Sequence, residues 1–213
     1  SLLLRIRFFL YNPFMSSRVR ALQEEFDDDS LCLIHVEPDG DCFYDCVAQC
    51  LNCDSTSNNN SSSSHHSIQT LRDTVASETT IDQLELFNIA NNAGLEGYEF
   101  MNTNPALPLL QAMLRLKKQV YADEFAIRTI SRVYEVVILI LDEETQKRKR
   151  GQSQSNADNR FVAIDDTSLN SPRFMVLQRT RRQHFNLMKF ASQIIFTHNT
   201  LPDQVMKKFL QKI

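Results

Sequence analysis

The stretch that decides the predicted fold is Pro38-Asp39-Gly40-Asp41-Cys42-Phe43-Tyr44-Asp45-Cys46. It joins the apolar run 31–36, which we predict to be a buried strand, to the segment 42–51, which we predict to be a helix. Cys42 falls at or near the start of that helix, where free backbone N–H groups favour a negative charge and should help the thiol to ionise. The same N–H groups, with those of the glycine turn, can stabilise an oxyanion. The pattern therefore predicts a cysteine nucleophile.

Composition and charge narrow the class of protein. The chain has 213 residues, of which 42% are hydrophobic and 23% are charged, so it can bury one sizeable core. A net charge of -3 does not suggest a nucleic-acid-binding protein, which is usually basic. No apolar run approaches the roughly 18 residues of a membrane helix, so we expect no membrane segment. Because the chain begins at Ser1 without a methionine, we expect it to be a fragment or a processed form.

Cysteine content indicates the compartment. Five cysteines, an odd number, argue against a disulfide framework, and four of them lie between Cys42 and Cys53. This distribution favours a reducing, cytoplasmic location. The basic run 147–150 leaves a nuclear-import signal open, although a solvated loop is the more common role of such a run.

Hydrophobic periodicity predicts an α+β fold, with helices in the first two thirds and strands in the last third. We expect a strand and a helix in an N-terminal extension (1–30), a main domain (31–190) and a C-terminal helical extension (191–213). Strands are predicted at 136–141, 161–164, 174–178 and 184–190, of which the first is continuously apolar and should be buried on both faces. The Ser/Asn-rich segment 54–67 should be a disordered insert, and 142–159 a charged loop.

A nucleophilic thiol needs an imidazole as its base and a group that orients the imidazole. His35 lies within the predicted strand before the turn, His65 and His66 lie in the predicted insert, and His198 lies in a polar loop. His184 opens a predicted strand, and the alternation of a strand places Asn186 on the same side. On spacing alone His184 is the best candidate base, although a lone strand histidine is more often structural.

Three blocks of the chain resemble a known family. Asp39-Gly40-Asp41-Cys42-Phe43-Tyr44 resembles the nucleophile motif of the ovarian tumour (OTU) cysteine proteases, and His184-Phe185-Asn186 resembles their distal histidine motif. Between them, the stretch from Tyr121-Ala122-Asp123 to the strand 136–141 resembles the family's middle block. The chain departs from the family pattern at Asp45 and Cys46, and at Tyr121-Ala122, where the middle block commonly has Trp-Gly.

The resemblance implies a papain-like α+β fold, with a central sheet flanked by helices, and deubiquitinating activity without a cofactor. Cys42 would be the nucleophile and His184 the general base, with ubiquitin or polyubiquitin as the partner. Asn186 matches the residue that orients the histidine. Asp39 matches an aspartate assigned either to the triad or to support of the oxyanion loop, and sequence does not choose between these roles. The backbone amides of Gly40, Asp41 and Cys42 are the candidate oxyanion donors.

Three alternatives remain open at the level of sequence. Cys42, Cys46 and Cys50 share one helical face, so that with Cys53 and His65 or His66 they could bind zinc, although the paired short spacings of a structural zinc site are missing. The domain could also be a catalytically weak module that binds ubiquitin or acts as a scaffold. Finally, the substrate could be a ubiquitin-like modifier or a polyprotein.

Overall fold

The computed structural model describes residues 16–57, 65–116, 120–143, 160–169, 172–180 and 184–210. Predictions for the N-terminal strand, for most of the charged loop and for the basic run 147–150 lie outside these residues. The described elements, in chain order, are α1 (Ser17–Phe26), β1 (Cys32–Ile34), α2 (Cys42–Ser57), α3 (Ile68–Glu78), α4 (Ile81–Asn92), the 3₁₀ helix η1 (Glu99–Thr103), α5 (Leu107–Arg115), α6 (Glu124–Tyr134), β2 (Val136–Asp142), β3 (Phe161–Ile164), β4 (Arg173–Thr180), β5 (His184–Lys189), β6 (Ile195–Phe196) and α7 (Asp203–Phe209).

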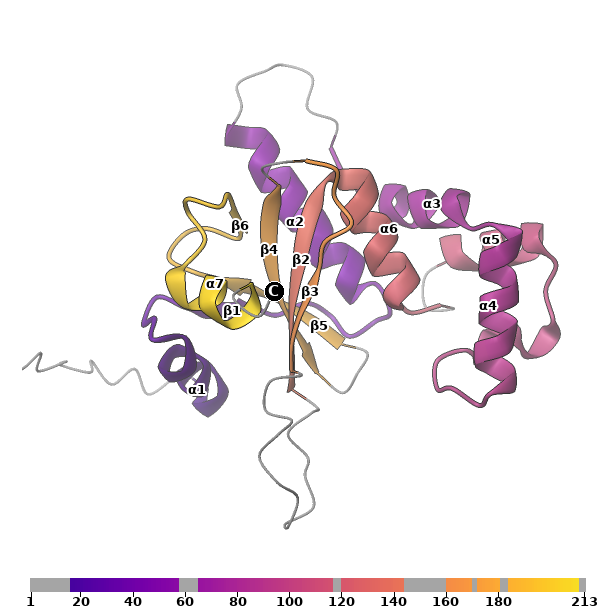
Figure 1. Ribbon diagram of the computed structural model, residues 1–213, viewed down its shortest axis with the longest axis horizontal. Helices are drawn as coiled ribbons and strands as arrows, with labels where there is room; N and C mark the ends of the chain where they lie inside the picture. Colours follow the sequence, from indigo (N-terminus) through magenta and orange to yellow (C-terminus); the bar gives the residue numbers. More distant parts are fainter. Residues whose placement is uncertain are drawn as a thin grey trace, which may run out of the picture.

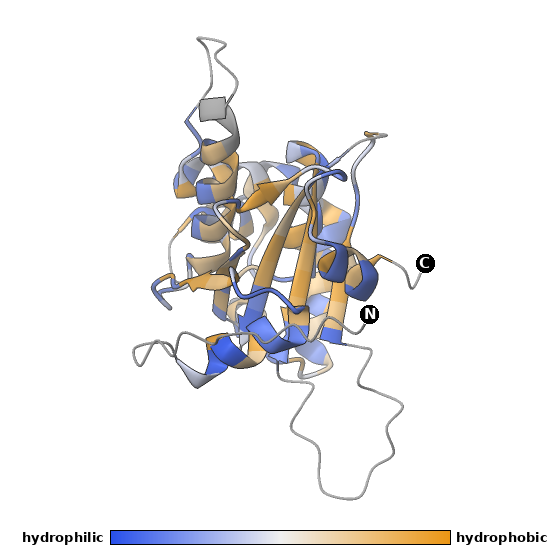
Figure 2. Ribbon diagram, turned by 90° about the vertical axis from the view of Figure 1, so that its left-hand side faces the viewer, coloured by the Kyte–Doolittle hydropathy of each residue, from blue (hydrophilic) through white to orange (hydrophobic). Residues whose placement is uncertain are grey.

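A mixed sheet with the strand order β1-β5-β4-β2-β3 forms the centre of the protein, and β6 pairs with β4. The central strands β2 and β4 are parallel, and the other pairs are antiparallel. This arrangement of sheet and helices confirms the predicted α+β class. The strands are mostly apolar, as the hydropathy colouring in Figure 2 shows.

Helices cover both faces of the sheet. α2 and α6 lie on one side, and α1 and α7 lie on the other (Figure 1). β2 shows why both layers form: Val136, Ile138 and Ile140 enter the core beneath α2 and α6, whereas Val137 and Leu139 enter the core beneath α1 and α7. The continuous apolar run of this strand therefore serves both faces, as predicted.

A third apolar cluster lies outside the two layers. Phe87 of α4, Met101 of η1 and Leu110 of α5 are buried together there, and α3 links this cluster to the main core. Figure 1 shows these helices extending to one side of the sheet. Within the described part of the chain, no helix has both the length and the apolar character that a membrane span requires.

Two elements differ from their predicted form. The predicted buried strand 31–36 is shorter: β1 spans Cys32–Ile34, is half-buried, and lies at the edge of the sheet beside β5. α2 runs to Ser57 instead of ending near residue 51, so it enters the predicted insert 54–67. At the other end of the insert, the side-chain amide of Asn52 exchanges two hydrogen bonds with the backbone of His66, and residues 58–64 of the predicted insert lie outside the described part of the chain.

Candidate active site

Cys42 begins α2 and lies in the interior, with 3% of its surface exposed. The backbone bends at Gly40, whose φ of 92° is a conformation that glycine adopts without a steric penalty. Asp45 N–H then donates to the Asp41 carbonyl at 2.8 Å, which closes the first turn of the helix. The glycine turn therefore delivers the thiol to a helix N-terminus, as the sequence predicted.

The Cys42 thiol faces the strand that carries His184. Phe185 N–H points at Cys42 Sγ, with an N···S distance of 3.4 Å. The phenyl rings of Phe43 and Phe185 also pack edge to face, 5.4 Å apart between centroids. The residues that follow Cys42 and His184 thus hold α2 against β5.

Burial raises the pKa of the Cys42 thiol, and the nearby carboxylate of Asp39 raises it further. The N–H groups of Phe185 and Phe43 lower the pKa, but they do not overcome the burial. The predicted effect of the helix N-terminus is present, since the Phe43 N–H lowers the pKa, but burial outweighs it and the net shift of the pKa is upward. Burial therefore opposes ionisation of this thiol.

His184 opens β5 and is half-buried. Its Nε2 lies 3.2 Å from Asn186 Oδ1, so strand alternation brings the two side chains together as predicted. Nδ1 of the same ring is buried and has no hydrogen-bond partner among the described residues. The imidazole is therefore held at one nitrogen while the other is available to accept a proton.

Asp39 belongs to the loop that leads into the nucleophile. Its Oδ1 accepts the backbone N–H of Asp41 at 3.1 Å, an Asx-type turn. This contact favours the loop-supporting role for Asp39. It also occupies one of the three candidate oxyanion donors, because the Asp41 amide is directed at the carboxylate.

Arg72 of α3 is a functional candidate that our sequence reasoning missed. It is 1% exposed and lies beneath the nucleophile loop, where Nε donates to Asp41 Oδ1 at 2.6 Å and Nη2 donates to the Gly40 carbonyl at 2.9 Å. Its guanidinium carbon also lies 4.5 Å from the centre of the Tyr44 ring. The sequence held a signal: four residues after Ile68 and three before Val75, Arg72 sits on the apolar face of α3.

The remaining cysteines do not assemble a metal site in the described residues, where no group of three or more His, Cys, Asp or Glu side chains is placed to hold an ion. Cys46 and Cys50 are fully buried in the core, and burial raises the pKa of both thiols. Cys50 Sγ lies 3.4 Å from the Ile194 carbonyl, whereas Cys53 is exposed. Buried thiols of this kind behave as small apolar side chains.

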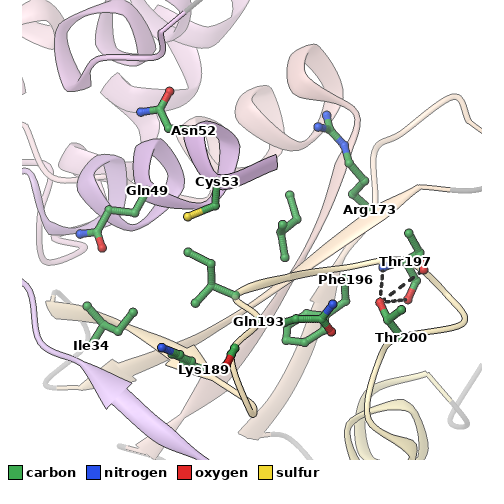
Figure 3. Close-up of a pocket in the computed structure, with 13 residues that line it drawn as sticks. Ile34, Gln49, Asn52, Cys53, Arg173, Lys189, Gln193, Phe196, Thr197 and Thr200 are labelled. Atoms are coloured by element: carbon green, nitrogen blue, oxygen red, sulfur yellow. Dashed lines mark hydrogen bonds between the residues drawn. The ribbon is translucent and has the colours of Figure 1, made fainter. Parts of the chain in front are cut away.

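A separate cavity of about 750 Å³ lies beside the later turns of α2, toward β6. Figure 3 shows Gln49, Cys53, Lys189 and Arg173 around it. Cys42, His184 and Asn186 are not among its lining residues. The cavity is thus distinct from the arrangement around the thiol.

Comparisons with known proteins bear on the fold. No protein-family model matches the sequence, and no curated protein matches it. Among solved structures, an ovarian tumour (OTU) domain in complex with ubiquitin matches with a TM-score of 0.50 at 13% identity, over 84% of this chain and 81% of that chain. An OTU deubiquitinase from Wolbachia pipientis wMel matches with a TM-score of 0.43 at 11% identity, over 84% and 96%. On the first of these matches, and on the sheet and helices described above, the chain has the fold of OTU domains.

Proposed function

We propose that this chain is a cysteine-type deubiquitinase that hydrolyses the isopeptide bond at the C-terminus of ubiquitin. One observation carries the proposal. The Cys42 sulfur lies 3.4 Å from the backbone nitrogen of Phe185, the residue that follows His184 in β5. The His184 ring is held through Nε2 by Asn186. A thiol, an imidazole and an orienting amide are the groups that acyl transfer through a thioester requires. The OTU fold supports ubiquitin as the substrate class.

The reaction follows from the two nitrogens of His184. Nδ1 accepts the Cys42 proton as the sulfur attacks the carbonyl carbon of the terminal glycine of ubiquitin, and the S–C bond forms. The tetrahedral intermediate then expels the lysine amine, which takes the proton from His184 as the C–N bond breaks. Water next attacks the thioester, with His184 accepting its proton, and the thiol is restored as the carboxylate product leaves.

The loop before Cys42 does not present all of its candidate oxyanion donors in the free protein. The contact between Asp39 and the Asp41 amide leaves the oxyanion site without one of its three candidate donors. The amides of Cys42 and Gly40 are the remaining donors among those predicted. We expect substrate binding to release the Asp41 amide, because an N–H aimed at the developing oxyanion stabilises the transition state.

The test is a ubiquitin that carries an electrophile at its C-terminus, followed by intact-mass measurement. We expect one adduct, located at Cys42 by peptide mapping. Cys42→Ala should abolish it, and Cys53→Ala is the matched control, because this exposed thiol lies outside the proposed site. Folded protein that forms no adduct would contradict the proposal.

The same assay separates the alternative functions. Binding of ubiquitin without an adduct would identify a non-catalytic ubiquitin-binding module. Probes built on ubiquitin-like modifiers, run in parallel, would reveal a different modifier as the substrate. A panel of di-ubiquitin linkages, with Cys42→Ala as the control, then measures linkage preference.

A further inference from the structure

A line of polar side chains continues beyond the His184–Asn186 pair. Asn186 Nδ2 donates to Gln178 Oε1 at 3.1 Å, and Gln178 Nε2 donates to Glu143 Oε1. Arg18 of α1 holds that carboxylate at both oxygens, with an Nε–Oε1 distance of 3.1 Å. The chain of contacts therefore leads from the imidazole in β5, across β4, past the end of β2, to α1, which covers the sheet face opposite to α2.

Burial and register fix the Gln178–Asn186 part of this line, whereas the side chains of Arg18 and Glu143 at its end are 41% and 26% exposed. Gln178 is 0% exposed and Asn186 is 2% exposed. The two residues are direct partners in the antiparallel pairing of β4 with β5, so their side chains project side by side. Gln178 also pairs with Leu141 of β2, which brings the end of that strand within reach. Buried amides of this kind are constrained to satisfy one another.

The chemistry of the groups gives the line a direction. A carboxylate only accepts hydrogen bonds, so Gln178 must present its NH₂ group to Glu143 and its oxygen to Asn186. Asn186 must then donate with its own NH₂ group, which leaves its oxygen for His184. An oxygen at Nε2 requires that Nε2 carry the ring proton, so Nδ1 keeps its lone pair. The orientation of both amides and the tautomer of the imidazole follow from the charge at the far end.

We propose that Gln178, Glu143 and Arg18 are positioning residues that set the tautomer of His184. Arg18 donates to both oxygens of Glu143 and so holds the carboxylate in place. Nδ1 is the nitrogen without a hydrogen-bond partner in the described structure, and only this tautomer lets it accept a proton. The inference rests on the proposed function where it calls His184 the base, but the tautomer itself does not depend on activity.

The decisive variant exchanges the charges at the end of the line. Arg18→Glu combined with Glu143→Arg keeps an ion pair at the same place but makes residue 143 a donor. Gln178 must then turn its oxygen toward residue 143, Asn186 must turn its NH₂ group toward the ring, and Nε2 must accept. His184 should therefore change to the Nδ1–H tautomer. If the pair only stabilises the fold, the exchange restores its effect. If the pair sets the direction of the hydrogen bonds along the line, the exchange reverses that direction.

The readout is ¹⁵N NMR of the imidazole in Cys42→Ala protein, at a pH where the ring is neutral. The parent should carry its proton on Nε2 and the exchanged variant on Nδ1. In the Cys42 protein, kcat of the exchanged variant should fall by at least about tenfold at nearly unchanged KM, since the wrong tautomer cannot accept the thiol proton. The matched control exchanges the exposed pair Glu124 and Arg128, and should alter neither the tautomer nor kcat.

A second variant covers the case in which the exchanged protein does not fold. Glu143→Gln keeps the size and removes the charge, so both directions of the line become accessible and a Nδ1–H signal should appear. Retention of the pure Nε2–H tautomer in either folded variant would overturn the proposal that the line sets the tautomer of His184. The tautomer of His184 can be measured by NMR even in a protein without protease activity. Failure of the proposed function and failure of the positioning role are therefore separate results.

Discussion

Replacing Arg72 by Met tests how strongly the nucleophile loop depends on one buried cation. The guanidinium donates to the Asp41 carboxylate and to the Gly40 carbonyl, and its Nη1 donates to the carbonyls of Leu114 at 3.0 Å and Val120 at 3.3 Å. Met fills a similar volume but supplies no donor. The substitution therefore leaves a carboxylate that is 4% exposed without its guanidinium partner.

The expected cost follows from the burial of this pair. Removing one partner of a buried ion pair destabilises a protein by about 3–5 kcal/mol, and the carbonyls left behind add to that figure. We expect Arg72→Met to lower the free energy of unfolding by about 4 kcal/mol, which for a chain of this size corresponds to a fall in Tm of about 8–16 °C. Urea unfolding followed by circular dichroism measures the change in free energy.

Two comparisons decide whether the buried pair is the cause. Arg128→Met removes a guanidinium that pairs with carboxylates at the surface, and should cost less than about 1 kcal/mol. Adding Asp41→Asn to Arg72→Met removes the orphaned charge, so the double variant should be more stable than the sum of the two single losses predicts. A loss below about 1 kcal/mol for Arg72→Met would refute the reasoning.

Three further predictions concern the base, a helix cap and alkaline pH. Asn186→Ala should lower kcat in di-ubiquitin cleavage by about tenfold or more, but less than His184→Ala does, because an orienting group is partly dispensable. Equal activity of His184→Ala and the parent would exclude His184 as the base. Asp123 caps α6 by accepting Ala126 N–H at 3.0 Å, so Asp123→Ala should cost about 1 kcal/mol in urea unfolding at pH 7, whereas Asp123→Asn, which can still cap, should cost less. Burial and the neighbouring Asp123 raise the pKa of Tyr98 to about 12, so the folded state favours the neutral phenol. The free energy of unfolding should therefore fall as pH rises from about 10 toward 12, and this fall should be smaller in Tyr98→Phe.

Local pattern predicted those parts of the site that depend on neighbours in the chain. The glycine turn and the helix start at Cys42 can be recognised from residues 38–42, although Arg72 also supports the loop. The pairing of His184 with Asn186 follows from the two-residue period of a strand. The burial of β2 on both faces follows from its unbroken apolar run. Each of these is a short-range consequence of side-chain type and backbone period.

Contacts between distant segments could not be predicted in the same way. Arg72 is 31 residues from Asp41, and Arg18 is 125 residues from Glu143. The local sequence around each arginine does not identify its partner, although an arginine on the apolar face of a helix does indicate a buried acceptor. The net pKa shift of Cys42 could not be predicted for a related reason, because the helix N-terminus is visible in the sequence and the degree of burial is not.

The two arginines act on opposite halves of the proposed dyad, and this division explains how elements far apart in the chain meet in one geometry. Arg72 fixes the loop before Cys42 from α3, and Arg18 fixes Glu143 at the start of the line to His184 from α1. Between the halves, the edge-to-face contact of Phe43 with Phe185 sets the spacing of α2 and β5. Polar contacts thus orient the reacting groups within each half, while apolar packing sets the distance between them. Loss of either arginine should therefore disturb the orientation of one reacting group and leave the separation of the two elements largely unchanged.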